Sequence, residues 1–155
     1  PVIFGDGFPT PNGRGKFIPA GIISPDEVPD DEFPMVLTTG RQLEHWHTGV
    51  MTRRAAILNE LEPDAICELS PSDAQRMGIV SGAKVRVTSR RGVIELAARI
   101  TSTVPDGLLF IPFCYSEAAA NLLTNPTLDP FGKIPELKFC SVRLEEVASV
   151  QPGES

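Results

Sequence analysis

The sequence predicts a small, mainly β protein whose short strands, with a few short helices, close into a β-barrel. Short runs of β-branched and apolar residues recur along the chain, separated by turns rich in Gly, Pro, Ser and Asp. Residues 83–100 alternate apolar and polar positions around a tight turn, which is typical of a β-hairpin. About six or seven such strands and two or three helices favour a closed barrel, because closure removes exposed sheet edges.

The length and composition indicate one domain. The chain has 155 residues and is 41% hydrophobic, which is enough for a real core but leaves little room for a second one. Residues 1–33 are rich in Pro and Gly and have few periodic apolar positions, so we expect an extended approach segment, with an acidic, mobile stretch at 26–32. Because the chain starts at Pro1, it reads as a piece of a longer protein.

The first half of the barrel, predicted for residues 34–148, alternates strands with helices. A strand is expected at 35–39, ended by Gly40, and a helix at 52–61 with Thr52 as its N-cap. The segment AICELS (65–70) predicts a short strand. The next helix begins after Ser70, which can cap it, and ends at Gly78.

The second half continues from the hairpin at 83–100, where Val85 and Val87 alternate with charged and polar residues. LLFIPF (108–113) predicts an apolar strand after a Pro-Asp-Gly turn, and SEAAANLL (116–123) has the composition of a short helix. A last strand is expected at 138–147, followed by a disordered tail at 149–155.

Charge and residue usage exclude several classes of function. The net charge is −6 and the 14 basic residues are scattered, so we expect no nucleic-acid partner. No apolar run approaches the roughly 20 residues that span a bilayer, so no membrane insertion is expected. Cys67, Cys114 and Cys140 are widely spaced and lack a C-x-x-C pair, which predicts three packed thiols rather than a disulfide framework or a metal site.

The densest group of functional residue types lies at 39–53, directly after the first predicted strand. It contains both histidines and the only tryptophan. Gly40 permits a close backbone approach, Arg41 offers a planar fork of donors, and the hydroxyls of Thr39 and Thr48 add hydrogen-bonding groups. This pattern indicates binding of an anionic ligand at the end of a strand.

Other interpretations of this segment stay open. His45 and His47 would point the same way on a strand, but a zinc site needs about three or four protein ligands, and no others lie nearby in the sequence. A histidine can also act as a general acid or base, or the segment can be a polar turn packed around Trp46. A second, weaker group consists of Phe113, Asn121 and Lys138, which by themselves are typical of core, capping and solvated residues.

The segment TTGRQLEHWHTGVMTRR resembles T-G-R-x-x-x-H-W-H-T-G-x-M-T-R of the dimethyl-sulfoxide-reductase superfamily, close to formate dehydrogenases and periplasmic nitrate reductases. The similarity continues through PSDAQRMG and SRRG to NLLTNPTLDPFGKIPELKFCSVR, which is similar to N-x-L-T…D-P…K-x-C-A-V-R with Ser141 in place of Ala. FPTPNGRGKF resembles the approach segment of formate dehydrogenases. The resemblance therefore covers nearly the whole chain.

The resemblance implies a double-psi β-barrel of the aspartate-decarboxylase-like type, the last domain of a large subunit, which binds bis(molybdopterin guanine dinucleotide) with Mo or W. The Gly-Ser cleavage pair of pyruvoyl-forming decarboxylases on related barrels is absent from the sequence. The binding roles that the resemblance implies fall on Thr39, Gly40, Arg41, Glu44, His45, Trp46, His47, Thr48, Phe113, Asn121 and Lys138.

The resemblance also implies a division of labour. In the family, the 4Fe-4S cysteines and the metal-ligating residue lie in domains that precede this one, so we expect no catalytic residue here and no activity of the chain alone. Its partners would be the cofactor, the remaining domains of the same subunit and electron-transfer subunits, in the cytoplasm or alternatively the periplasm. Formate is the favoured substrate. A nitrate-reductase-like domain and a stand-alone protein-interaction barrel remain alternatives.

Overall fold

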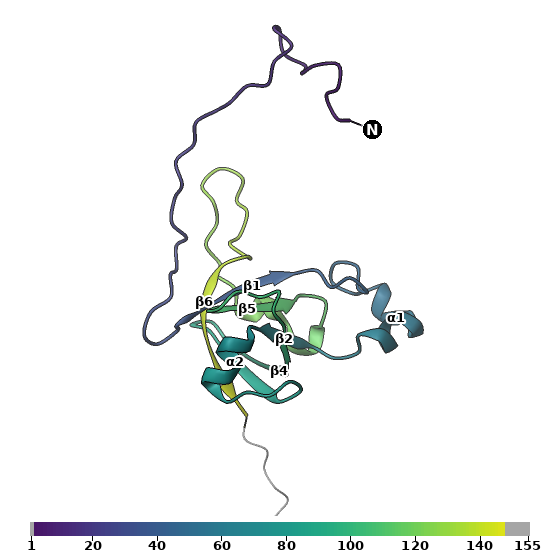
Figure 1. Ribbon diagram of the computed structural model, residues 1–155, viewed down its shortest axis with the longest axis vertical. Helices are drawn as coiled ribbons and strands as arrows, with labels where there is room; N and C mark the ends of the chain where they lie inside the picture. Colours follow the sequence, from purple (N-terminus) through teal and green to yellow (C-terminus); the bar gives the residue numbers. More distant parts are fainter. Residues whose placement is uncertain (1, 148–155) are drawn as a thin grey trace, which may run out of the picture.

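The computed structural model describes residues 2–147, which form one small barrel with an extended N-terminal arm (Figure 1). The strands are β1 (Met35–Gly40), β2 (Ile66–Leu69), β3 (Lys84–Thr88), β4 (Val93–Ile100), β5 (Leu108–Pro112) and β6 (Cys140–Glu146). The helices are α1 (Ala56–Leu61) and α2 (Pro71–Met77), with short 3-10 turns η1 (Thr52–Arg54), η2 (Ser116–Ala118) and η3 (Ala120–Leu122).

The six strands close into a ring in the order β1-β5-β2-β4-β3-β6. Two pairs are parallel, β1 with β5 and β2 with β4, and the other four are antiparallel. Exchanging β1 with β4, β2 with β5 and β3 with β6 reproduces the same set of pairings. This internal two-fold pattern of crossed parallel connections is that of a double-psi β-barrel, so the predicted fold class is confirmed.

The inward side chains of the six strands fill the barrel, as the period-two pattern predicts. Leu37, Leu69, Val85, Leu109 and Val142 are fully buried, each on a different strand. Cys67, Cys114 and Cys140 are buried free thiols, as the sequence predicted. Burial raises the pKa of each thiol, in the case of Cys140 to about 11. The cysteines therefore behave as small core residues.

Helix α2 forms where the sequence placed it. The Ser70 side chain accepts a hydrogen bond from the Asp73 N–H at 3.1 Å, Pro71 occupies the first turn, and Gly78 ends the helix with φ 72°. Asp73 is fully buried, and its carboxylate also accepts the Gly107 N–H at 2.7 Å. The helix is thereby joined to the turn that precedes β5.

Replacing Ser70 with alanine is expected to lower the free energy of unfolding by about 1 kcal/mol, because the Asp73 N–H loses its cap inside the protein. Urea denaturation followed by circular dichroism measures this. Ser72→Ala is the matched control. Ser72 lies two residues after Ser70 and is exposed, so its replacement should change stability little. Equal losses in the two variants would contradict the capping role.

Two predicted helices are shorter than expected. The helix predicted at 52–61 is divided at Ala55, whose backbone is extended, and Thr52 does not cap it: its hydroxyl accepts the Trp46 N–H at 3.0 Å instead. Helix α1 buries no residue, so no packing face supports a longer helix. The helix predicted at 116–123 is two 3-10 turns separated by Ala119, which is also extended.

The approach segment contains no strand or helix at residues 2–33, but its acidic end is attached to the barrel. Glu27 and Asp30 form ion pairs with Arg90 and Arg91, and Phe33 is buried. The structure thus differs from the mobile acidic stretch that the sequence predicted at 26–32. The predicted tail at 149–155 lies outside the described residues. None of the helices in residues 2–147 has the length and apolar character needed to cross a membrane.

Candidate functional site

The pairing of β1 brings three candidate residues to one end of the barrel. Since β1 and β5 are parallel, Gly40 lies opposite Pro112, and both strands end at the same edge. The Phe113 N–H donates to the Gly40 carbonyl at 3.1 Å. Strand β6 is antiparallel to β1, so the residues just before it reach the same edge.

Lys138 contacts both strand ends at this edge of the barrel. Its Nζ donates to the Thr39 carbonyl and lies 5.5 Å from the centroid of the Phe113 ring. The Thr39 hydroxyl donates to the Leu137 carbonyl at 2.8 Å. Gly40 has no room for a side chain, because a Cβ would come within 2.4 Å of the Phe110 ring. The structure therefore brings together Thr39, Phe113 and Lys138, which are far apart in the sequence.

Arg41, Trp46 and His47 form a second, exposed cluster in the loop after β1. The Arg41 guanidinium lies 5.4 Å from the centroid of the Trp46 ring, and its Nη2 donates to Nε2 of His47 at 3.2 Å. The Trp46 and His47 rings meet edge to face at 4.6 Å. His47 has φ 49° and Gly49 has φ 74°, which turn the loop back on itself. A cation thus lies on an aromatic surface, an arrangement suited to planar and anionic groups.

His45 lies in the same loop but faces the interior, with 1% of its surface exposed. Its Nε2 donates to the Glu62 carbonyl at 2.8 Å, which fixes the tautomer, and its ring meets Tyr115 edge to face. The Tyr115 hydroxyl donates to the same carbonyl at 3.1 Å. Within residues 2–147, the buried His45 Nδ1 has no hydrogen-bond partner. The two histidines therefore do not converge, and among residues 2–147 no group of three potential ligands could hold a metal.

The other predicted residues have fewer contacts. Glu44 is half-buried and lines a shallow cavity of about 620 Å³ together with Arg41, His45 and Trp46. Thr48 is exposed. Asn121 is exposed in η3, and within residues 2–147 no hydrogen bond or aromatic contact joins its side chain to the other candidates.

Arg53 makes several of the contacts that hold this loop, although the sequence did not mark it as a candidate residue. Its guanidinium donates to Glu117 at 2.6 Å and to the Pro63 carbonyl at 3.3 Å, and lies 4.8 Å from the Tyr115 ring centroid. The ion pair raises the pKa of Arg53 and lowers that of Glu117. Together with His45, Arg53 attaches the loop to the segment after β5. In the sequence, the one indication of this role is that Arg53 is the last residue of the 39–53 group.

Comparisons with known proteins identify the family of this chain. The family described as molydopterin dinucleotide binding domain matches residues 35–141. The chain is 44% identical over 138 residues to the F420-dependent formate dehydrogenase 1 subunit alpha of Methanococcus maripaludis, covering 89% of this chain and 20% of that protein. It is 45% identical over 146 residues to the F420-dependent formate dehydrogenase subunit alpha of Methanocaldococcus jannaschii, covering 94% of this chain and 22% of that protein.

Among solved structures, acetylene hydratase from Pelobacter acetylenicus matches with a TM-score of 0.66 and 21% sequence identity over 74% of this chain and 18% of that one. This similarity supports the fold. The family match places the chain in the class of cofactor-binding domains. The chain belongs to the molydopterin dinucleotide binding domain family. It spans about one fifth of the length of the curated relatives it matches.

Proposed function

We propose that this chain binds the dinucleotide part of bis(molybdopterin guanine dinucleotide), carrying Mo or W, as one domain of a formate dehydrogenase large subunit. The observation that carries the proposal is the meeting of Thr39, Phe113 and Lys138 at the barrel end from which the Arg41 loop emerges. Membership of the family and the names of the relatives support the cofactor class and the substrate.

The donor chemistry of the site fits such a cofactor. A guanine dinucleotide presents pyrophosphate oxygens and flat ring systems. Arg41 and Lys138 offer positive charge, and the Thr48 hydroxyl and the backbone at Thr39 and Gly40 offer hydrogen-bonding groups. An exposed aromatic face for ring stacking is available on Trp46, with His47 beside it, and Phe113 adds a partly buried ring next to Lys138. We include Glu44 and Asn121 as polar groups at the edge of the site.

His45 has a different place in this proposal. Because it is buried and donates to the Glu62 carbonyl, we assign it to positioning the loop, together with the Arg53–Glu117 pair, rather than to direct contact. The bound cofactor would supply the two-electron exchange between formate and CO2. The residues of this chain bind and orient, and we propose no catalytic residue among them, so the chain alone is expected to be inactive.

Replacing both Arg41 and Lys138 with alanine in the full-length subunit is expected to lower its cofactor content about tenfold or more, because each cation contributes about 1.5–3 kcal/mol in a hydrogen bond to an anion. The measurement is the guanine nucleotide released by acid hydrolysis per mole of purified subunit, so it does not depend on activity.

The matched control replaces Lys84 and Arg86, which are exposed cations on β3 paired with Glu95. This double variant removes the same charge and should keep its cofactor. If the Arg41/Lys138 variant also retains full cofactor content, the proposed site is wrong, and an interaction module becomes the better interpretation of the barrel.

We propose the cytoplasm as the compartment, which agrees with three buried, unpaired thiols. The proposed partners are the remaining domains of the same subunit and, for transfer of the electrons, further subunits. The length of the relatives supports the first of these partners.

A further inference from the structure

Two segments project from the same end of the barrel and run alongside each other in the view of Figure 1: the N-terminal arm (residues 2–26) and the loop at 126–137. A cavity of about 460 Å³ lies between their bases, lined by Ser24 and Asp26 of the arm and by Leu128, Pro130 and Ile134 of the loop. The two projections therefore meet at their bases.

The loop has its own folded structure. The Asp129 carboxylate accepts the N–H groups of Phe131, Gly132 and Ile134 at 2.7–2.9 Å, and these hydrogen bonds lower its pKa. At the base, a bridge joins Leu128 to Pro135. The Asn125 side chain donates to Glu136 and accepts the Thr127 N–H. The loop is thus shaped largely by its own hydrogen bonds.

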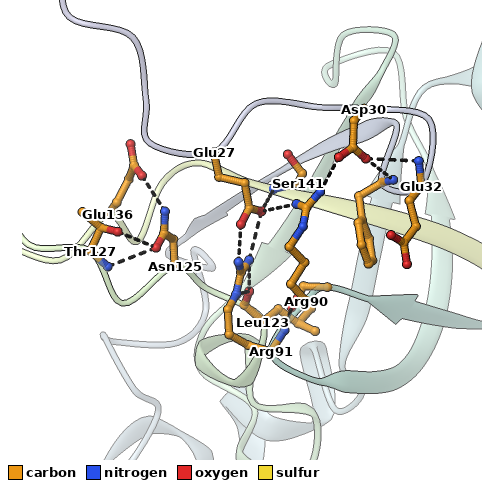
Figure 2. A network of polar contacts seen from close by, with 12 residues as sticks. Glu27, Asp30, Glu32, Arg90, Arg91, Leu123, Asn125, Thr127, Glu136 and Ser141 are labelled. Carbon is orange, nitrogen blue, oxygen red and sulfur yellow. Dashed lines mark hydrogen bonds and ion pairs between the residues drawn. The ribbon is translucent and has the colours of Figure 1, made fainter.

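The arm is fixed at its base by the network in Figure 2. Glu27 accepts hydrogen bonds from the Arg91 guanidinium and from the Ser141 N–H, the latter at 2.6 Å. Asp30 pairs with Arg90, and its carboxylate also accepts the Phe33 N–H at 2.8 Å. The buried Phe33 ring lies between Arg90 and Arg143, at 4.6 and 5.6 Å from their guanidinium carbons. This fixes the direction in which the arm leaves the barrel.

Both projections present large apolar side chains that nothing in residues 2–147 covers. On the arm, Phe17 and Ile22 are fully exposed and Ile23 is 90% exposed. On the loop, Phe131 is 94% and Ile134 70% exposed. Single exposed apolar residues are common, but several large ones on two segments that meet at their bases indicate an interaction surface.

We infer that the arm and the 126–137 loop form a two-pronged docking surface for another domain of the same polypeptide. The inference rests on the proposal that the chain is one domain of a longer subunit. The chain spans only 20–22% of the relatives' length, which leaves about four fifths of such a subunit to cover these side chains. The loop also lies between Asn121 and Lys138 in the sequence, so docking would hold two proposed cofactor residues in place.

Thiol accessibility in the full-length subunit tests this surface. Ile22→Cys and Ile134→Cys place one thiol on each prong, while the native thiols of this chain are buried, with raised pKa values that keep them unreactive. Gln75→Cys is the control, because Gln75 is exposed on α2, away from the prongs (Figure 1). Alkylation by iodoacetamide is followed by peptide mass analysis, first in the native subunit and then in urea.

In the native subunit, the thiols at 22 and 134 should react about tenfold or more slowly than in urea, because the core of an interface excludes water. The thiol at 75 should react at nearly the same rate in both conditions. The protection should be unchanged by dilution, since docking within one polypeptide does not depend on concentration.

Native rates at 22 and 134 that match the control would overturn the inference. Protection that disappears on dilution would also overturn it and would assign the surface to a second copy of the subunit. Neither result touches cofactor content, which is measured separately, so failure of the docking surface is distinguishable from failure of the proposed function.

Discussion

Leu109→Ala is expected to lower the free energy of unfolding by about 3 kcal/mol, since deleting a fully buried leucine side chain leaves a cavity in a packed core. Leu109 is 0% exposed in β5 and lies opposite Leu37 of β1 in the parallel pair. Because β5 lies between β1 and β2 in the ring, the cavity would loosen the packing of three neighbouring strands. Urea denaturation of the chain measures the change.

Leu61→Ala is the matched control, because Leu61 is the exposed last residue of α1 and the same atoms are removed from a side chain in water. Its unfolding free energy should stay within about 0.5 kcal/mol of the parent. If Leu109→Ala were equally mild, the barrel interior would be less tightly packed than its burial indicates.

Glu27→Ala is expected to destabilise the chain by about 2 kcal/mol at neutral pH, because the Arg91 guanidinium and the Ser141 N–H both lose a charged partner in a half-buried setting. The arm should then separate from the barrel before the barrel unfolds. Hydrogen exchange at the Ser141 amide, compared between parent and variant, reports this directly. Glu32→Ala is the control, since Glu32 is mostly exposed and lies 3.8 Å from Arg143.

This contribution depends on pH in a defined direction. Burial by itself would raise the pKa of Glu27, but the hydrogen bonds from Arg91 and the Ser141 N–H outweigh it and hold the pKa below its ordinary value of 4.5. A carboxyl group whose pKa is lower in the folded state stabilises that state above its unfolded pKa. The difference in stability between parent and Glu27→Ala should therefore be full at pH 7 and shrink as the pH falls below 4.5. A difference that is constant down to about pH 3 would contradict the ion pair.

Local signals in the sequence were sufficient for most of the secondary structure. The strands and the hairpin at 83–100 follow from period-two alternation, and α2 follows from Ser70 and Gly78, whose effects act within one helical turn. The helix expected at 52–61 is shorter than predicted. The composition of this segment favours a helix, but the contacts of the surrounding loop do not. Thr52 serves the Trp46 N–H, and no packing face rewards a longer helix.

The candidate site divides in the same way. The sequence by itself determined the 39–53 group, since Arg41, Trp46 and His47 are neighbours in one loop, and the resemblance named the ligand class. Only the tertiary structure decided that Phe113 and Lys138 meet Thr39, because their contact depends on the parallel pairing of β1 with β5 and the antiparallel pairing with β6.

The tertiary structure also separated the two histidines, which are equivalent by sequence. It directs His45 inward to the Glu62 carbonyl and leaves His47 beside Arg41. Likewise, nothing local to residues 26–33 shows that Glu27 pairs with Arg91, which is 64 positions away. Side-chain chemistry and short-range periodicity depend on neighbouring residues and can be read from the sequence. The closure of a barrel depends on strand pairings between segments that are far apart in the sequence.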